Sequence, residues 1–183
     1  MKRILGTSLL FTVLALQSVT AAPALSIAKF CDASISQVEG EVVALAEAMP
    51  SDKYEFAPTS GDFKGVRTFA QQMLHIATVN YSVSAAALGE KMPVTVGKGE
   101  NGPDGIKTKE AIVKYLKDSF AYAHKAANSI TAENYMEMVK TGPNRTSTRA
   151  ALIAEPVWHS NDHYGQAVVY ARMNGIVPPA SRR

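Results

Sequence analysis

Two histidines of this sequence, His159 and His163, lie four residues apart, a spacing that is suited to metal binding. On a helix, side chains at i and i+4 project from the same face about one turn apart, so both imidazoles can reach a single metal ion. The chain holds 4 histidines, and a pair at this spacing also arises by chance. Two core histidines that neighbouring side chains satisfy are therefore the alternative interpretation.

The sequence argues against three familiar kinds of metal site. In a zincin the residue after the first histidine is a glutamate base, whereas Ser160 stands at that position here. The sequence has no Glu-x-x-His repeat of the kind that di-iron bundles use. A c-type haem would need Cys-x-x-Cys-His, but Cys31 is the one cysteine of the chain.

Four segments with helical periodicity would position these residues. Their apolar residues recur every three or four positions, and Gly, Pro, Asn and Asp are frequent between them. The expected helices run from Ile27 to Met49, from about Arg67 to Leu88, from an N-cap at Thr108 to Ala127, and from near Ser147 to Gly175.

The connections between these helices are long. The stretch from Gly89 to Thr108 is rich in glycine and predicts a surface loop, and residues 133–139 could hold one helical turn. No segment alternates between apolar and polar residues as a half-buried strand does. We therefore expect an all-α, up-down four-helix bundle with long connecting loops.

The N-terminus has the order of a secretory signal peptide. Positive charges at Lys2 and Arg3 precede an apolar run from Ile4 to Leu16, and small residues follow. The run is too short for a transmembrane helix, although a retained anchor is the alternative. We expect residues 1–21 to be removed and the domain at 22–183 to reach the periplasm or the medium without a membrane anchor.

Removal of Lys2 and Arg3 would lower the formal net charge from +3 to +1, since no acid is lost with them. A nearly neutral domain lacks the electrostatic attraction that nucleic-acid binding requires, so we expect no nucleic-acid partner. The remaining ~160 residues are enough for one domain with a full hydrophobic core.

Several segments of the chain resemble DinB-like domains. The last helix, with His-x-x-x-His, Tyr164-Gly165-Gln166 and the run from Arg172 to Pro179, resembles the end of such domains. The stretch from Ala48 to Pro58, then Arg67-Thr68-Phe69 and Gln72 to Ala77, is similar to the family's first loop and second helix. The chain thus resembles the DinB/YfiT-like superfamily over nearly all of its expected mature length.

The resemblance implies a third metal ligand, His75, beside His159 and His163. Periodicity alone does not select His75, because its neighbours on the helical wheel form a mixed polar side of the kind that usually faces solvent. Three histidine ligands leave further positions open, as in a catalytic metal site. Imidazole ligands suit a divalent ion, with zinc and nickel favoured about equally.

The outer residues of this site are less sharply defined by the sequence. Asp162 and Gln166 lie beside the histidines on the last helix, so either could orient an imidazole or contact a metal-bound water. Asp162 is the candidate catalytic residue, and a plain surface carboxylate is the alternative interpretation.

The resemblance implies a metal-dependent enzyme that acts on a small molecule, because the relatives include thiol-dependent transferases and hydrolases. Export argues against transferases that use cytosolic thiols, so hydrolysis is favoured over transfer. The alternative is a non-catalytic metal-binding or sensing bundle of the cell envelope, since one scaffold supports several functions. Related bundles often pair through helices, and a homodimer is therefore expected.

Overall fold

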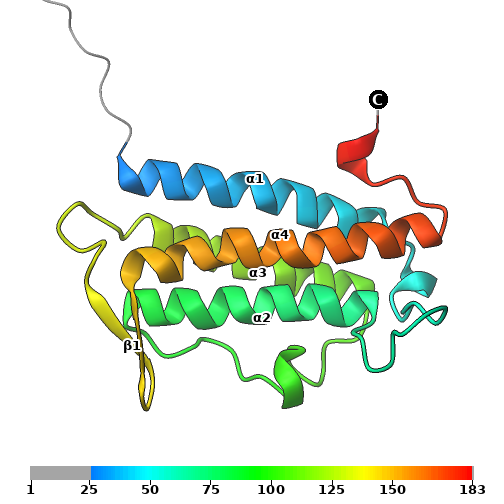
Figure 1. Cartoon of the computed structure of the whole chain (residues 1–183), viewed down its shortest axis with the longest axis horizontal. Coiled ribbons are helices and arrows are strands. Elements are labelled where there is room, and N and C mark those ends of the chain that lie inside the picture. The colour runs from blue at the N-terminus through cyan, green and yellow to red at the C-terminus, as the bar shows by residue number, and fades with distance from the viewer. Residues whose placement is uncertain (1–25, 183) are drawn as a thin grey trace, which may run out of the picture.

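Four α-helices make up most of the computed structural model, which describes residues 26–182 (Figure 1). The helices are α1 (Ile27–Ala48), α2 (Phe69–Leu88), α3 (Lys109–Ala127) and α4 (Arg149–Met173), and the predicted four-helix bundle is confirmed. No helix within the described range is long and apolar enough to cross a membrane. The signal peptide expected at residues 1–21 lies outside the described residues.

Each helix begins at a side chain that satisfies a free backbone N–H group. Ser26, Thr68, Thr108 and Thr148 each accept a hydrogen bond from the N–H group three residues further on. At α2 the Gln71 side chain also accepts from the Thr68 N–H, which completes a capping box. These caps fix where α2 and α4 begin, and with them the faces on which their histidines lie.

The helices pack in a ring, in which α2 contacts α3 and α4, and α1 contacts the same two helices. Helices α1 and α4 run in one direction, while α2 and α3 run in the other (Figure 1). The helices therefore do not alternate in direction throughout, as a simple up-down order would have it, and the parallel pair α2 and α3 needs a long return connection. Residues 89–108 supply it, including the short 3₁₀ helix η2 (Lys98–Glu100), and this loop runs along α2.

A continuous apolar core fills the centre of the ring and holds α2 in place. Phe69, Met73 and Ile76 of α2 are fully buried among apolar residues of the other helices. Tyr54, which follows the 3₁₀ helix η1 (Ser51–Lys53), packs edge-on against Phe69 with 5.2 Å between ring centroids. Another 3₁₀ helix, η3 (Pro179–Ser181), ends the described chain.

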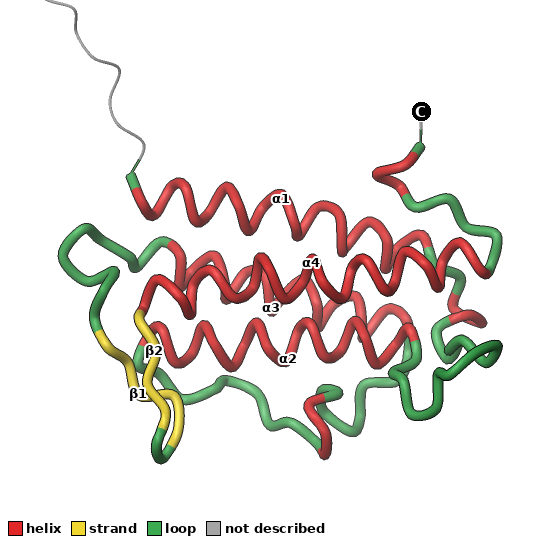
Figure 2. Tube along the Cα trace, viewed as in Figure 1, coloured by secondary structure: helices red, strands yellow, loops and turns green. Residues whose placement is uncertain are grey.

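The prediction that the chain has no strands is wrong, because a β-hairpin follows the hydrogen-bonded turns at residues 132–136, which lie in part of the stretch where one helical turn was expected. Strands β1 (Met138–Gly142) and β2 (Arg145–Thr148) pair in antiparallel register at one end of the bundle (Figure 2). Both strands are largely exposed, so they need no alternation of apolar and polar residues. The Arg149 guanidinium joins the start of the hairpin to α2, because it forms an ion pair with Glu137 and donates a hydrogen bond to the Ala87 carbonyl.

Candidate metal centre

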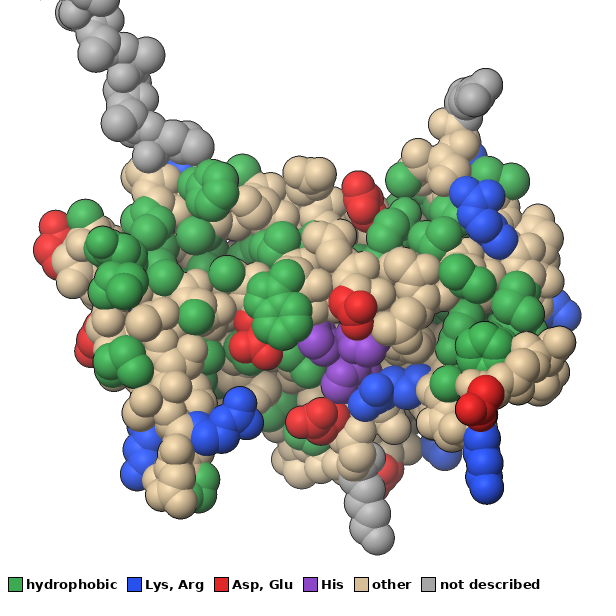
Figure 3. All heavy atoms as spheres, in the orientation of Figure 1, with side chains coloured by type: hydrophobic (Ala, Val, Ile, Leu, Met, Phe, Trp, Pro, Cys, Tyr) green, Lys and Arg blue, Asp and Glu red, His purple; other side chains and the backbone are tan. Residues whose placement is uncertain are grey.

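The structure brings together the three histidines that the sequence and the resemblance select. His75 lies in the middle of α2, and His159 and His163 lie one turn apart on α4. Their candidate ligand nitrogens all lie within 4.8 Å of one another. Figure 3 shows histidine side chains gathered at the surface, with acidic and basic side chains around them on the same face.

The ring of His75 is held by a backbone carbonyl from the loop over α2. Its Nδ1 lies 3.1 Å from the Glu100 carbonyl oxygen, which can only accept, so Nδ1 carries the proton. The lone pair of the neutral ring is therefore on Nε2, which lies 3.2 Å from Nε2 of His159. Glu100 itself has a left-handed backbone with φ of 58°, a conformation that non-glycine residues seldom adopt.

The ring of His163 is held by a chain of amide side chains. Its Nδ1 donates to the Gln72 side-chain oxygen at 2.6 Å, and the Gln72 amide donates to Gln166 at 3.0 Å. Gln166 in turn donates to the Asp162 carboxylate at 3.2 Å. Nε2 of His163 is thereby left with its lone pair. Asp162 is exposed and reaches the histidine through two amides, as an orienting residue would.

The donor set fits a divalent cation. The half-buried His159 has a buried Nδ1 without a hydrogen-bond partner among residues 26–182. Its Nε2 faces the Nε2 lone pair of His75, so either His159 places its proton there or a cation lies between the two lone pairs. Imidazoles whose Nδ1–H groups are bound to carbonyl oxygens are the usual ligands of zinc and related metals.

Burial keeps all three imidazoles in the neutral form that a metal requires. Desolvation by burial is the main cause that lowers the pKa of His159 to about 3, and the neighbouring imidazoles lower it further. Desolvation is also the main cause that lowers the pKa of His163 to about 4, and the nearby His75 lowers it further. The pKa of His75 is also lowered, mainly by desolvation. At neutral pH the cluster therefore offers lone pairs rather than protons.

The positive charge of Arg67 acts on this cluster and contributes to the lowered pKa of all three histidines. The Nε of Arg67 donates to the Asn101 side chain at 2.8 Å, which fixes the guanidinium at the edge of a cavity of about 490 Å³. Gln72 and Gln166 line the same cavity. An anionic or carbonyl oxygen that enters this cavity would meet the Arg67 guanidinium, whereas none of the three histidines lines the cavity.

Sequence reasoning assigned no role to Arg67, Gln72 or Glu100. Gln72 lies one turn before His75 and shares its face, so its position held a usable signal. Arg67 stood within the segment that resembles the family, but nothing in its spacing linked it to the histidines. Glu100 contributes a backbone carbonyl, which no residue type reveals.

The fourth histidine, His124, lies away from the cluster, between α1 and α3. Its Nδ1 is 2.7 Å from an Asp32 oxygen, and its Nε2 is 3.0 Å from a Glu39 oxygen. With both nitrogens bound to carboxylates, His124 has no lone pair for a metal.

Comparisons with known proteins agree with this fold. The chain is similar to the crystal structure of a DinB-like protein from Bacillus cereus, with 16% identity, a TM-score of 0.62, and 81% of this chain and 93% of the other covered. It is also similar to a conserved protein from Enterococcus faecalis, with 14% identity, a TM-score of 0.65, and 82% and 98% covered. No curated protein matches. The family model of the DinB superfamily matches residues 34–167, and the chain belongs to that superfamily.

Proposed function

We propose that this protein is an exported metal-dependent enzyme that acts on a small molecule, and that hydrolysis is its reaction. The observation that carries the proposal is the convergence of three neutral imidazoles, two of which have their Nδ1–H groups bound to oxygen acceptors. Three ligands leave positions open for substrate or water. A divalent ion there, zinc or nickel by ligand preference, would supply Lewis-acid chemistry.

The protein's own residues divide into two groups by what they would do. Gln72 and the Glu100 carbonyl hold the rings of His163 and His75 in one orientation, which preorganises the ligands. The Arg67 guanidinium, fixed by Asn101, would bind a substrate oxygen and stabilise negative charge that develops on it. The cavity that Arg67 lines is large enough to admit a small molecule.

The second candidate function is a non-catalytic metal-binding or sensing bundle. The position of Asp162 favours it, because this exposed carboxylate is bound to the Gln166 amide and separated from the histidines by two amides. A general base in a hydrolase would be expected within hydrogen-bond reach of the reacting water.

Turnover of chromogenic substrates distinguishes the two candidates. Metal-loaded protein would be assayed with para-nitrophenyl esters, para-nitrophenyl phosphate and an amino-acyl para-nitroanilide. We expect one class to be hydrolysed, and we expect chelation or His159→Ala to abolish that turnover. Arg67→Met should lower turnover while the metal stays bound, whereas Lys114→Gln on the exposed side of α3 should change neither. Absence of turnover over the whole panel by metal-loaded protein would favour the non-catalytic bundle.

Export and pairing are separate parts of the proposal and have separate tests. Terminal sequencing of protein from the periplasm or medium should show a start near residue 22. Protein that stays in the cytoplasm with Met1 intact would contradict export. Sedimentation of the mature chain should give the mass of a homodimer, and a monomer at all concentrations would contradict pairing.

A further inference from the structure

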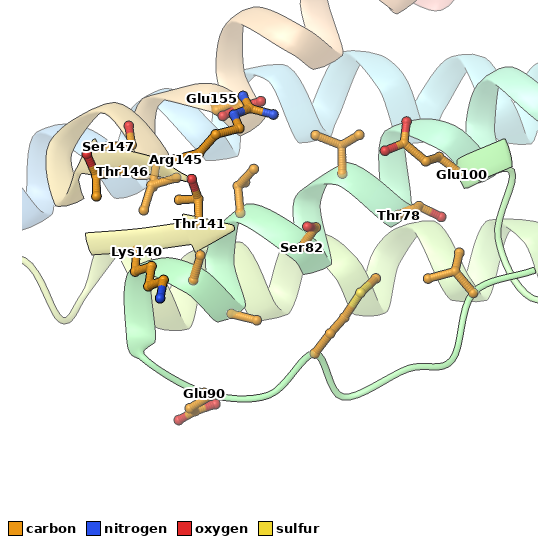
Figure 4. A pocket seen from close by; sticks show the side chains of 17 residues that line it. Thr78, Ser82, Glu90, Glu100, Lys140, Thr141, Arg145, Thr146, Ser147 and Glu155 are labelled. Carbon is orange, nitrogen blue, oxygen red and sulfur yellow. The ribbon is translucent and has the colours of Figure 1, made fainter. Parts of the chain in front are cut away.

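A second cavity, of about 550 Å³, lies between α2, the hairpin and the loop over α2 (Figure 4). Its volume falls within the range of small-molecule pockets. One end adjoins the metal centre, because Thr78 lies one turn beyond His75 and Glu100 holds His75 through its carbonyl. From Thr78 to Ala86 the cavity follows α2 for ~12 Å, at 1.5 Å per residue.

One wall of this hairpin cavity is apolar. It is formed by side chains from α2, the loop and the start of α4: Val79, Val83, Ala86, Met92, Val96 and Leu152. Burial of a hydrocarbon body against this wall would be favourable because it removes apolar surface from water.

The opposite wall, from the hairpin, contributes two cations, Lys140 and Arg145. Within residues 26–182 neither cation has a carboxylate within ion-pair distance. The hydroxyl groups of Thr141, Thr146 and Ser147 line the same wall (Figure 4). Cations and hydroxyl donors together provide the hydrogen bonds that a carboxylate accepts.

Three acidic residues line the cavity, Glu90, Glu100 and Glu155, and Figure 4 shows Glu100 at the end away from the hairpin. The Glu90 carboxylate is bound by Lys125 at 2.6 and 2.9 Å and by the Tyr122 hydroxyl at 2.7 Å. Figure 4 places Glu155 beside Arg145. Desolvation raises the pKa of Glu155, although the positive charge of Arg145 acts in the opposite direction. The net effect makes ionisation of Glu155 less favourable than that of an exposed glutamate.

We propose that the hairpin cavity binds an elongated carboxylic acid. Its hydrocarbon body lies along α2, its carboxylate lies at the hairpin end of the cavity with Lys140 or Arg145 as its cation, and its other end reaches the metal centre. This assignment names the substrate class of the enzyme proposed above, and its catalytic part rests on that proposed function. The binding of the acid does not depend on turnover.

Binding can be measured with octanoate, whose extended length of ~10 Å fits the ~12 Å of α2 that the cavity follows. The full chain would be titrated with the fluorescent dye anilinonaphthalene sulfonate, and octanoate would then displace it. We expect octanoate to displace the dye at concentrations at least about tenfold lower than octylamine, since octylamine has no carboxylate to accept charge-assisted hydrogen bonds. Equal displacement by the two compounds would overturn the assignment.

Substitution at the hairpin sharpens the test. Lys140→Gln together with Arg145→Gln should weaken octanoate binding at least about tenfold, because the carboxylate loses its charge-assisted hydrogen bonds. The matched control is Lys114→Gln with Lys117→Gln, which removes the same charge from the exposed side of α3 and should leave octanoate binding unchanged. Lys140 and Arg145 are exposed, so thermal melting should show that the hairpin variant folds. Equal octanoate affinity in the parent and the hairpin variant would overturn the proposal.

The two proposals can fail separately. His124→Gln should bind octanoate as the parent does, because His124 lies between α1 and α3 and does not line the cavity. Octanoate binding without hydrolysis of any ester would support the cavity assignment and contradict the proposed enzymatic activity. Hydrolysis that octanoate does not inhibit would support the proposed enzymatic activity and overturn the cavity assignment.

Discussion

The bundle contains two histidine sites, and the atoms around the rings differ between them. Between α2 and α4, His75 and His163 donate to a carbonyl and an amide oxygen, and burial lowers their pKa values. Between α1 and α3, His124 lies between the carboxylates of Asp32 and Glu39. Burial lowers the pKa of His124, but the hydrogen bonds to Glu39 and Asp32 outweigh it, and the net shift is upward.

This difference decides what each site can do. Neutral acceptors fix a tautomer and leave one lone pair on each ring, so the first site suits metal binding. Two carboxylates bind both nitrogens of His124 and favour the charged ring, so the second site joins α1 to α3 by ion pairs. The residue type is the same at both sites, and the partners set the role.

The largest expected effect is the loss of stability when metal is removed. An ion that binds only the folded bundle stabilises it by about 2.7 kcal/mol when its concentration is 100 times Kd. For a domain of this size that corresponds to roughly 5–10 °C in Tm. Calorimetry with and without chelator should show this shift for the parent and for His124→Gln. A chelator-dependent shift of equal size in His159→Ala would show that the ion binds elsewhere.

Replacement of Gln72 tests whether the orienting amide matters. Gln72→Leu removes the acceptor for the His163 Nδ1–H group and should weaken metal binding by about 10–100-fold. The control is Gln37→Leu, on the exposed face of α1, which should leave metal affinity unchanged. If Gln72→Leu binds metal as tightly as the parent, the amide chain does not orient the ligand.

The stabilisation that His124 gives to the fold should depend on pH. Because the pKa of folded His124 is raised, its stabilisation is complete below the unfolded value near 6.5 and is lost as pH rises through the folded value. His124→Gln should therefore cost about 1–2 kcal/mol near pH 5.5, a figure limited by solvent screening of the partly exposed carboxylates. The cost should shrink at pH 9. Urea unfolding at both pH values measures it, and a cost that grows with pH would contradict the charged ring.

The smallest effect is expected at Asp162. Its carboxylate is exposed and meets the His163 ring only through Gln166 and Gln72. Asp162→Asn should change the metal-binding free energy by less than about 0.5 kcal/mol, as surface substitutions commonly do. A loss as large as that of Gln72→Leu would show that the carboxylate takes part directly in the site.

Much of the fold could be predicted because helix periodicity and caps are local properties. The first helix was expected from Ile27 to Met49 and runs from Ile27 to Ala48, and the N-cap at Thr108 is confirmed. The hairpin was missed because its strands lie on the surface. Exposed strands are held by backbone pairing and by Arg149, and neither leaves an alternating pattern in the sequence.

The candidate site could be predicted only in part. The i, i+4 spacing alone indicated His159 and His163, whereas His75 needed the family resemblance. Its polar surroundings suggested a solvated face, but His75 is only 6% exposed. The reason is the long loop, which covers that side of α2 and binds the ring through the Glu100 carbonyl. Such a cover depends on tertiary structure and leaves no periodic signal on α2.

Isothermal titration of the metal-free protein with zinc and with nickel tests the central claim most directly. The parent should bind about one ion per chain, and alanine at His75, His159 or His163 should weaken binding at least about 100-fold, because three ligands barely suffice for an open site. His124→Ala should bind as the parent does. Equal affinity in the parent and His159→Ala would show that the histidine pair is packing rather than ligation, and would contradict the account.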